Sequence, residues 1–334
     1  MVYNASVVSA LRDFGDKYYY LRLQLRWGLF GSIALISLSR LDPSFWKKMA
    51  TPLWCISLFL LLVVLIPGVG NKYLGARRWL GLGSIVFQPA EAAKFSIAIY
   101  LAAVLSKKPR LTPFLVSTGL AIGLIMLEPD LGTSIVILAN SLIIYFVSGG
   151  SLVKLAKLAP FVLIAGLLLV FVSPYRRERL LTYFNPDRDP QGSSYHIRQA
   201  LIAIGRGGLT GVGLGQSRQK YQYLPEVTTD SIFAIVGEEL GLVGSSLLIL
   251  GFVMLILTGI SVARNSENNF EKLLATGMIG WIASQTVVNL GAIVGILPLT
   301  GVPLPLVSYG GSSLVVAMGS IGVILSVRRS QHET

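Results

Sequence analysis

Residues 173–231 read SPYRRERLLTYFNPDRDPQGSSYHIRQALIAIGRGGLTGVGLGQSRQKYQYLPEVTTDS, the one long polar interval in a chain of apolar runs. Every other gap between apolar runs is far shorter. A long segment without a hydrophobic period is usually either functional or disordered. Because this one mixes Arg, Tyr, His and Gly instead of repeating Ser, Pro or Glu, we expect residues 174–230 to form an ordered, functional loop.

The composition around this interval is typical of a membrane protein. Of the 334 residues, 53% are hydrophobic and only 13% are charged, with a mean hydropathy of +0.68. A soluble domain carries about 25% charged residues. The single Cys55 excludes a disulfide within the chain, and two histidines are too few for a His-based metal site. We therefore expect no metal and no cofactor, and leave dependence on a divalent cation open.

Nine segments have the apolarity of membrane helices, which need about 20 residues to span a bilayer. They are residues 25–39, 51–69, 89–106, 113–127, 131–148, 155–173, 231–263, 273–297 and 306–327. The N-terminal MVYNASVVSAL resembles the end of a tenth helix whose beginning is missing. The prediction is an all-α polytopic membrane protein with about ten transmembrane helices. Residues 1–334 are expected to form one integral membrane domain, with the large loop 174–230 outside the cytoplasm.

The distribution of Lys and Arg over alternate short loops predicts the orientation. One set of loops holds twelve cations: Arg40, Lys47, Lys48, Lys107, Lys108, Arg110, Lys154, Lys157, Arg264, Lys272, Arg328 and Arg329. Cytoplasmic loops carry such an excess, so this side and the C-terminus are expected to face the cytoplasm. Many of the basic residues behind the net charge of +12 thus flank apolar segments, which argues against a nucleic-acid partner and for a membrane surface.

The basic segment 12–26 and two further groups of cations lie on the opposite side, against this bias. The first holds Lys72, Arg77 and Arg78; the second, in the long loop, holds Arg176, Arg177, Arg179, Arg198, Arg206, Arg218 and Lys220. Solvated loop charge explains any single member. Two clusters on one face favour an anionic ligand there.

Ionisable residues inside apolar segments are costly, so they are usually paired or functional. Glu91 and Lys94 lie three apart and share a helix face, which fits a structural salt bridge or a ligand contact equally well. Asp130, in EPDLGTS, is placed to cap a helix. Glu238 and Glu239 lie about two turns, or about 12 Å, inside the apolar helix that is expected to begin near Asp230. One of them is expected to line a polar cavity and the other to bind a neighbouring helix.

Asp230 lies at the start of the helix that follows the basic loop. A carboxylate at this interface could approach a hydroxyl group, and helix capping by Thr229 or Asp230 is an equal alternative. The Gly-rich stretch 205–215 has no βαβ unit around it, so we expect turns and close backbone packing, not nucleotide binding. SYGGSS at 308–313 fits small-residue packing or a backbone patch near a phosphate, and packing is favoured for most of it.

Five of these stretches together resemble the SEDS family, the peptidoglycan polymerases of shape, elongation, division and sporulation. They are GARRWLGLG with FQPAEAAK (75–94), EPDLGTS (128–134), SYHIRQALIAIGRGGLTGVGLGQSRQKYQYLPE (194–226), TDSIFAIVGEELGLVG (229–244) and LPLTGVPLPLVSYGGSSL (297–314). The likeness spans essentially the whole chain, and it is greatest to the division-type and sporulation branches. One departure is Thr228, where the family usually has His.

The resemblance implies ten membrane helices, lipid II as substrate, and a class B penicillin-binding protein and other division proteins as partners in the bacterial cytoplasmic membrane. It implies Asp230 as the essential carboxylate, with roles for Arg78, Trp79 and Lys94. The candidate substrate-binding residues are Arg78, Trp79, Lys94, Glu91, Asp130, Arg198, Lys220, Glu238 and Ser308. The hypothesis is that Asp230 is a general base in an inverting glycosyl transfer. The alternatives are a flippase of lipid-linked precursors, or a non-catalytic division scaffold that would not need Asp230.

Overall fold

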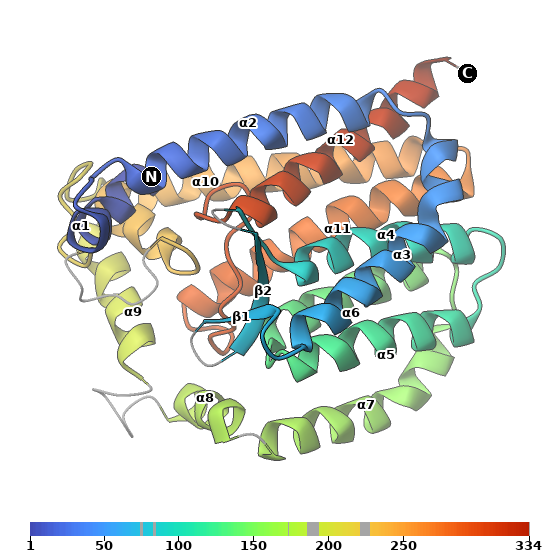
Figure 1. The fold of residues 1–334 in the computed structure, drawn as a ribbon, viewed down its shortest axis with the longest axis horizontal. Coiled ribbons are helices and arrows are strands. Elements are labelled where there is room, and N and C mark those ends of the chain that lie inside the picture. Colours follow the sequence, from blue (N-terminus) through green and yellow to red (C-terminus); the bar gives the residue numbers. More distant parts are fainter. Residues whose placement is uncertain (74–75, 83–84, 173, 186–193, 221–227, 334) are drawn as a thin grey trace. The chain divides into compact units, whose positions relative to one another are not determined.

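The computed structural model of the chain describes residues 1–333 except 74–75, 83–84, 173, 186–193 and 221–227 (Figure 1). The described helices are α1 Val2–Phe14, α2 Tyr19–Ser39, α3 Pro43–Leu65, α4 Pro89–Leu105, α5 Leu111–Leu127, α6 Leu131–Val147, α7 Leu152–Val172, α8 Pro174–Phe184, α9 Tyr195–Gly207, α10 Ile232–Asn265, α11 Asn269–Ile293 and α12 Gly311–Glu333. The strands are β1 Gly70–Tyr73, β2 Ala76–Leu82 and β3 Ile85–Phe87. Parts of the quoted motifs, among them 221–226 and Gly75, and the side chains of Lys72 and Arg176 lie outside the described residues.

Each of the nine predicted apolar segments coincides with one helix, namely α2 to α7 and α10 to α12. In the described part of the chain, α3, α10, α11 and residues Gly311–Gln331 of α12 are long and apolar enough to cross a membrane, and α5 and α6 are shorter apolar helices. Helix starts follow from local chemistry. Asp42 caps α3 by accepting a hydrogen bond from the Ser44 backbone at 2.7 Å, and Pro89 occupies the first turn of α4.

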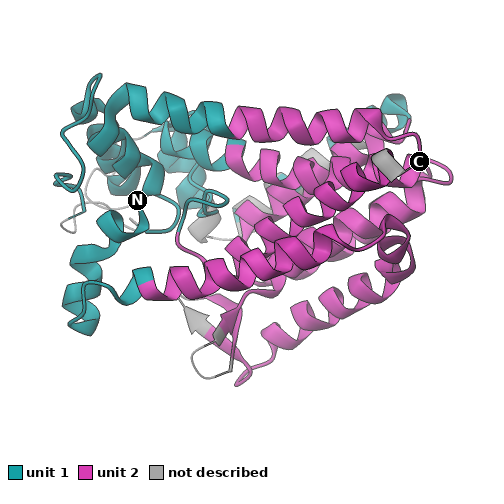
Figure 2. Ribbon diagram, turned by 90° about the horizontal axis from the view of Figure 1, so that it is seen from above, with its two compact units in different colours: residues 1–21, 151–251, 287–308 teal, residues 22–150, 252–286, 309–334 magenta. Residues whose placement is uncertain are grey.

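The chain forms two compact units, which Figure 2 shows in different colours. Unit 1 comprises Met1–Leu21, Ser151–Gly251 and Val287–Ser308, and unit 2 comprises Arg22–Gly150, Phe252–Thr286 and Tyr309–Thr334. In unit 2, α4 packs against α3, α5 and α6, and most of its side chains are buried. Gly31 and Gly322 allow α2 and α12 to approach closely, because a β-carbon at Gly322 would lie 2.6 Å from the Leu35 carbonyl oxygen.

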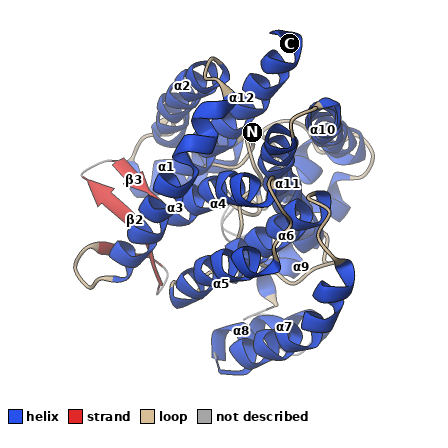
Figure 3. Ribbon diagram, turned by 90° about the vertical axis from the view of Figure 1, so that its right-hand side faces the viewer, coloured by secondary structure: helices blue, strands red, loops and turns tan. Residues whose placement is uncertain are grey.

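A three-stranded antiparallel sheet lies between α3 and α4 in the sequence, and the all-α prediction missed it. The strand order is β1-β2-β3, with Gly70 opposite Leu80 and Leu80 opposite Phe87; Figure 3 shows strands in red. β2 contacts α3 and carries Arg77, Arg78 and Trp79. A search for membrane-length apolar runs does not detect such short strands, although their aromatic and β-branched residues favour them.

In unit 1, the long polar interval contains two helices, α8 and α9. The small residues Ala200, Ala203 and Gly207 form the buried face of α9. Gly207 lies so close to α10 that a β-carbon there would be 1.9 Å from the Gly237 carbonyl oxygen. α10 begins at Ile232, slightly later than the predicted start at 229–230, and it is kinked at Gly241, where φ is 65° and ψ is −162°. Close backbone packing of the Gly-rich stretch is therefore confirmed.

Candidate functional site

Asp230 lies in a turn, residues 228–231, directly before α10 in unit 1. Only 8% of the Asp230 surface is exposed, and Ser231 is fully buried. The hydroxyl of Thr229 donates to Asp230 Oδ1 over a long distance of 3.4 Å. A buried carboxylate at the edge of an apolar helix is costly unless its surroundings are arranged for it.

Two side chains from distant parts of the sequence fix the backbone of this turn. Ser308 donates its hydroxyl hydrogen to the carbonyl oxygen of Thr229 and accepts a hydrogen bond from the Leu304 backbone at 2.8 Å. Asn289 of α11 donates from Nδ2 to the carbonyl oxygens of Asp230 and Val302, both at 2.8 Å. Ser308 and Asn289 are both buried. They therefore tie the turn to the segment that connects α11 and α12.

The two helices of the long loop contribute a further side of the site. His196 Nε2 of α9 lies 2.5 Å from the hydroxyl oxygen of Ser231. Burial, and secondly the positive charge of Arg179, lower the pKa of His196 to about 4, so the imidazole is neutral at physiological pH. Arg179 of α8 donates from Nη1 to the carbonyl oxygen of Leu299 at 2.9 Å.

Gly301 marks the point where Asp230 and Arg179 converge. A β-carbon placed on Gly301 would lie 3.8 Å from Asp230 Oδ2 and 3.8 Å from Arg179 Nη1. Gly301 has a φ of 75°, which glycine adopts without strain. The 296–308 segment thus brings a bare backbone surface beside a carboxylate and a guanidinium group.

Glu238 and Glu239 hold the Gly-rich loop against α10. Glu238 accepts hydrogen bonds from the hydroxyl of Ser217 and, at 3.1 Å, from the backbone of Arg218, while Arg206 lies 3.8 Å away. Glu239 pairs with Lys220 Nζ at 3.4 Å and accepts from Asn4 at 3.2 Å. Both glutamates therefore bind neighbouring segments, Glu238 the loop at 217–218 and Glu239 both Lys220 and helix α1. Lys220, a candidate ligand contact, is buried and also donates to the carbonyl oxygen of Gly215.

In unit 2, Arg78 of β2 binds the hairpin between α5 and α6. Its Nε donates to the carbonyl oxygen of Glu128 at 2.9 Å, and its Nη2 donates to that of Pro129 at 2.6 Å. The Glu128 carboxyl group is fully buried, and neither oxygen has a hydrogen-bond partner among the described residues. Burial, and secondly the charge of Asp130, raise the pKa of Glu128 to about 9, although Arg78 opposes the shift. Glu128 is therefore a neutral acid at pH 7.

The predicted pair of Glu91 and Lys94 is a buried salt bridge with a 2.8 Å separation. Lys94 Nζ also donates to Gln285 Oε1 and lies 4.8 Å from the centroid of the Trp281 ring. Only 1% of the Lys94 surface is exposed. Among the described residues, Glu91 Oε2 has no hydrogen-bond partner, so this cluster retains one acceptor for a further donor.

The remaining predicted site residues lie in both units, at a helix start, on a strand and on a helix of the long loop. Asp130 is the N-cap of α6, because its carboxylate accepts from the Thr133 backbone and hydroxyl, both at 2.9 Å. Trp79 is half-buried on β2, opposite Asn71, and Arg198 is exposed on α9. Unit 1 thus holds Asp230, Arg198, Lys220, Glu238 and Ser308, and unit 2 holds the remaining candidates.

Sequence reasoning did not identify Asn289, Gln285 or Gly301. The first two are buried amides four residues apart on the apolar helix α11, and this spacing was a detectable signal of a polar helix face. Gly301 carried no such signal. Within the described residues, no group of three or more His, Cys, Asp or Glu side chains could hold a metal ion.

The chain matches known proteins over nearly its whole length. Residues 1–333 match the FtsW, RodA and SpoVE family, described as cell cycle proteins. Stage V sporulation protein E of Bacillus subtilis is 41% identical over 337 residues, covering 98% of this chain and 92% of that protein. The probable peptidoglycan glycosyltransferase FtsW of Coxiella burnetii is 41% identical over 345 residues, covering 98% and 91%.

Solved structures agree with this match. A chain from a peptidoglycan synthase complex, solved to explain how polymerization and crosslinking are coordinated, has a TM-score of 0.79 and 29% identity, covering 100% of this chain and 97% of its own. The rod shape determining protein RodA of Thermus thermophilus has a TM-score of 0.72 and 28% identity, covering 100% and 95%.

Proposed function

Because the chain belongs to the FtsW, RodA and SpoVE family, we propose that it is an inverting peptidoglycan glycosyltransferase that polymerises lipid II. Relatives named probable peptidoglycan glycosyltransferase support this reaction class. The observation that carries the proposal is the Asp230 turn, whose backbone is fixed by Ser308 and Asn289. A reacting group must be held in place in this way if it is to act without reorganisation.

In the proposed reaction, Asp230 is the general base. It takes the proton from the 4-hydroxyl of the acceptor N-acetylglucosamine, and that oxygen forms a bond to the anomeric carbon of the donor N-acetylmuramic acid. The bond from this carbon to the pyrophosphate oxygen breaks with inversion, and undecaprenyl pyrophosphate leaves. General-base catalysis contributes about 10²–10⁴-fold to such a step.

Cations stabilise the leaving pyrophosphate as its charge develops. Arg78 is one candidate, because Nη1 has no hydrogen-bond partner among the described residues while Nε and Nη2 hold the α5–α6 hairpin. Arg179 is a second candidate, from its position beside Gly301 and Asp230. Lys94 acts in this proposal through its buried cluster with Glu91, as a positioning residue.

The protein is a multi-pass membrane protein, and the distribution of Lys and Arg favours an active site outside the cytoplasm and a cytoplasmic C-terminus. A solved relative within a peptidoglycan synthase complex supports a crosslinking partner, which we propose to be a class B penicillin-binding protein.

The test is glycan synthesis by the purified full chain from labelled lipid II, with and without its penicillin-binding partner. Asp230→Asn removes the base but keeps the size of the side chain, so the rate should fall by about 10²-fold or more. The variant should still fold, since the bonds from Asn289 and Ser308 reach backbone oxygens, which the substitution leaves in place.

Asp130→Asn is the matched control, because Asn also caps helices well and Asp130 is a helix cap. It should retain most of the activity. Near wild-type polymer from Asp230→Asn would remove the proposed mechanism. Movement of lipid II across vesicles without any polymer would favour the transporter alternative.

A further inference from the structure

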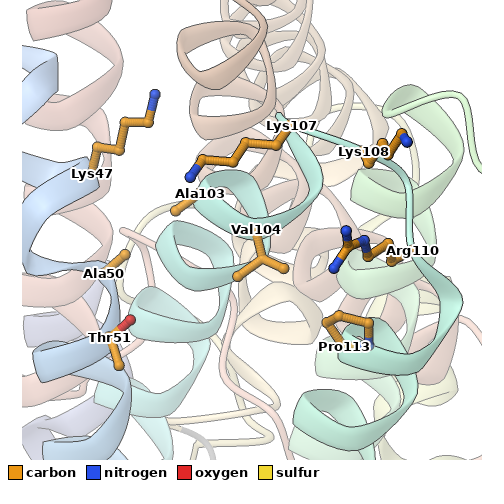
Figure 4. A pocket seen from close by; sticks show the side chains of 9 residues that line it. All are labelled: Lys47, Ala50, Thr51, Ala103, Val104, Lys107, Lys108, Arg110 and Pro113. Carbon is orange, nitrogen blue, oxygen red and sulfur yellow. The ribbon is translucent and has the colours of Figure 1, made fainter.

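A basic hollow of about 540 Å³ opens between α3, α4 and α5 in unit 2 (Figure 4). It is separate from all the candidate residues described above. Its lining residues are Lys47, Ala50, Thr51, Ala103, Val104, Lys107, Lys108, Arg110 and Pro113. Four of these nine are cations and none is acidic, so the lining of the hollow is strongly basic.

The four cations are available to a ligand. All are exposed, and none forms a salt bridge with a carboxylate in the part of the chain that the structure describes. Lys47 lies over the ring of Phe270, with Nζ 5.6 Å from the centroid. Lys107 also lines a smaller adjoining hollow of about 120 Å³ together with Lys272, which extends the positive surface.

The rest of the lining is small and largely apolar. Figure 4 shows the three lysine side chains near one level and Arg110 lower, beside Val104, with Ala50 and Pro113 further below. The Lys-Lys-Pro-Arg sequence of the short α4–α5 connection places three cations together at this rim. A soluble phosphate would use only the cations. A lipid uses both surfaces, since its phosphate binds the cations while its glycerol and first methylenes contact the apolar walls.

We propose that this hollow binds the phosphate-bearing head group of an anionic membrane phospholipid. The hollow lies at the end of the helices where Lys and Arg accumulate, which the charge distribution predicts to face the cytoplasm. Cytoplasmic leaflets hold anionic lipid, and basic pockets between membrane helices are suited to such head groups. The bound lipid would fix α3, α4 and α5 relative to one another at this end.

The experiment measures binding of phosphatidylglycerol to the purified full chain by native mass spectrometry at fixed ionic strength. Lys107→Gln with Arg110→Gln removes two cations of the hollow. Because each cation near a lipid surface contributes about fivefold to binding, this pair should weaken phosphatidylglycerol about 25-fold. The exchange of Lys107→Arg with Arg110→Lys retains the charge and should bind within a fewfold of wild type.

The matched control is Lys154→Gln with Lys157→Gln, which removes two exposed cations of α7 from the same predicted side. This pair should change binding less than twofold. Phosphatidylcholine should bind weakly to every variant, and inorganic phosphate should not displace phosphatidylglycerol. Equal losses in the two double variants would overturn the proposal in favour of diffuse surface charge. Displacement by inorganic phosphate would overturn it in favour of a soluble anion.

A second measurement does not depend on the folding of any variant. A photoactivatable phosphatidylglycerol, crosslinked to the wild-type chain, should label peptides that contain Ala103 or Pro113. Labels distributed over all helix ends, with no excess on these peptides, would contradict a specific site.

Discussion

Asn289→Ala should both destabilise the protein and slow glycan synthesis, because Asn289 fixes the turn that carries Asp230. The substitution removes two buried hydrogen bonds of 2.8 Å, to the carbonyl oxygens of Asp230 and Val302. Each such bond contributes about 1 kcal/mol net, and a buried carbonyl left unpaired costs about 1–3 kcal/mol. The substitution also removes the buried Oδ1 of Asn289, which has no hydrogen-bond partner among the described residues, and this partly offsets the loss of stability. We expect a net loss of about 2 kcal/mol.

The effect on the rate should be larger than the effect on stability suggests. A displacement of about 1 Å of a reacting group can cost 10²-fold, so we expect a 10- to 100-fold decrease in the rate of lipid II polymerisation. The assay pairs that rate with thermal unfolding of the same preparation. A turn displaced from its productive position should lower the rate at temperatures well below the unfolding transition, where the variant is fully folded.

Asn140→Ala provides a matched control on α6. Asn140 is as buried as Asn289, with 1% of its surface exposed against 2%, but neither of its side-chain polar atoms has a hydrogen-bond partner among the described residues. Its removal should leave the rate unchanged and the stability equal or higher. The reasoning is refuted if Asn289→Ala behaves like Asn140→Ala in both measurements.

Three further outcomes are expected. Glu128→Gln should raise the unfolding temperature at pH 8, because the folded protein must keep the Glu128 carboxyl group protonated. The stability of the wild type should therefore fall as the pH rises from 4.5 towards 9. A difference in stability between the two proteins that does not change with pH would contradict this. The pH dependence from His196 has the opposite direction, because its pKa in the folded protein lies below the usual 6.5. As the pH falls from 6.5 to about 4, the imidazole is protonated in the unfolded chain first, so the stability of the folded protein decreases. Unfolding measurements on His196→Gln should no longer show this decrease. Gly301→Ala should lose more activity than Gly295→Ala. Both positions have positive φ, so alanine at either one would carry about 1–2 kcal/mol of strain, but only Gly301→Ala adds a methyl group 3.8 Å from Asp230. Equal losses would indicate backbone strain alone.

The sequence predicted the positions of the apolar helices well because their signal is local. A run of apolar residues identifies a span without reference to any other part of the chain. The contacts of the candidate site are not local. Asn289 and Asp230 are 59 positions apart, Ser308 and Thr229 are 79 apart, and Arg78 and Glu128 are 50 apart. No spacing rule for a helix or strand relates such pairs, so their contacts could not be predicted from one sequence.

Asp130 and Asp230 show where sequence reasoning alone could not decide. Both precede a long apolar helix, and both were open to a capping interpretation. In the structure, both carboxylate oxygens of Asp130 accept hydrogen bonds from Thr133 at 2.9 Å, so this carboxylate completes the first turn of α6. At Asp230 the backbone of the turn and its neighbours are held as well: Ser308 binds the Thr229 carbonyl, Asn289 binds the Asp230 carbonyl, and His196 lies 2.5 Å from the Ser231 hydroxyl.

This difference has a chemical consequence. A carboxylate that caps a helix accepts hydrogen bonds from the first turn of that helix, and Asn can take over this role because it also caps helices well. A turn anchored through its backbone and its neighbours keeps its geometry when the carboxylate gains a proton. The turn that carries Asp230 is therefore held through backbone carbonyl groups, whereas the start of α6 is held through the carboxylate of Asp130. Conversion of each to Asn tests this distinction directly, since the change removes the charge at both sites and the hypothesised base at only one.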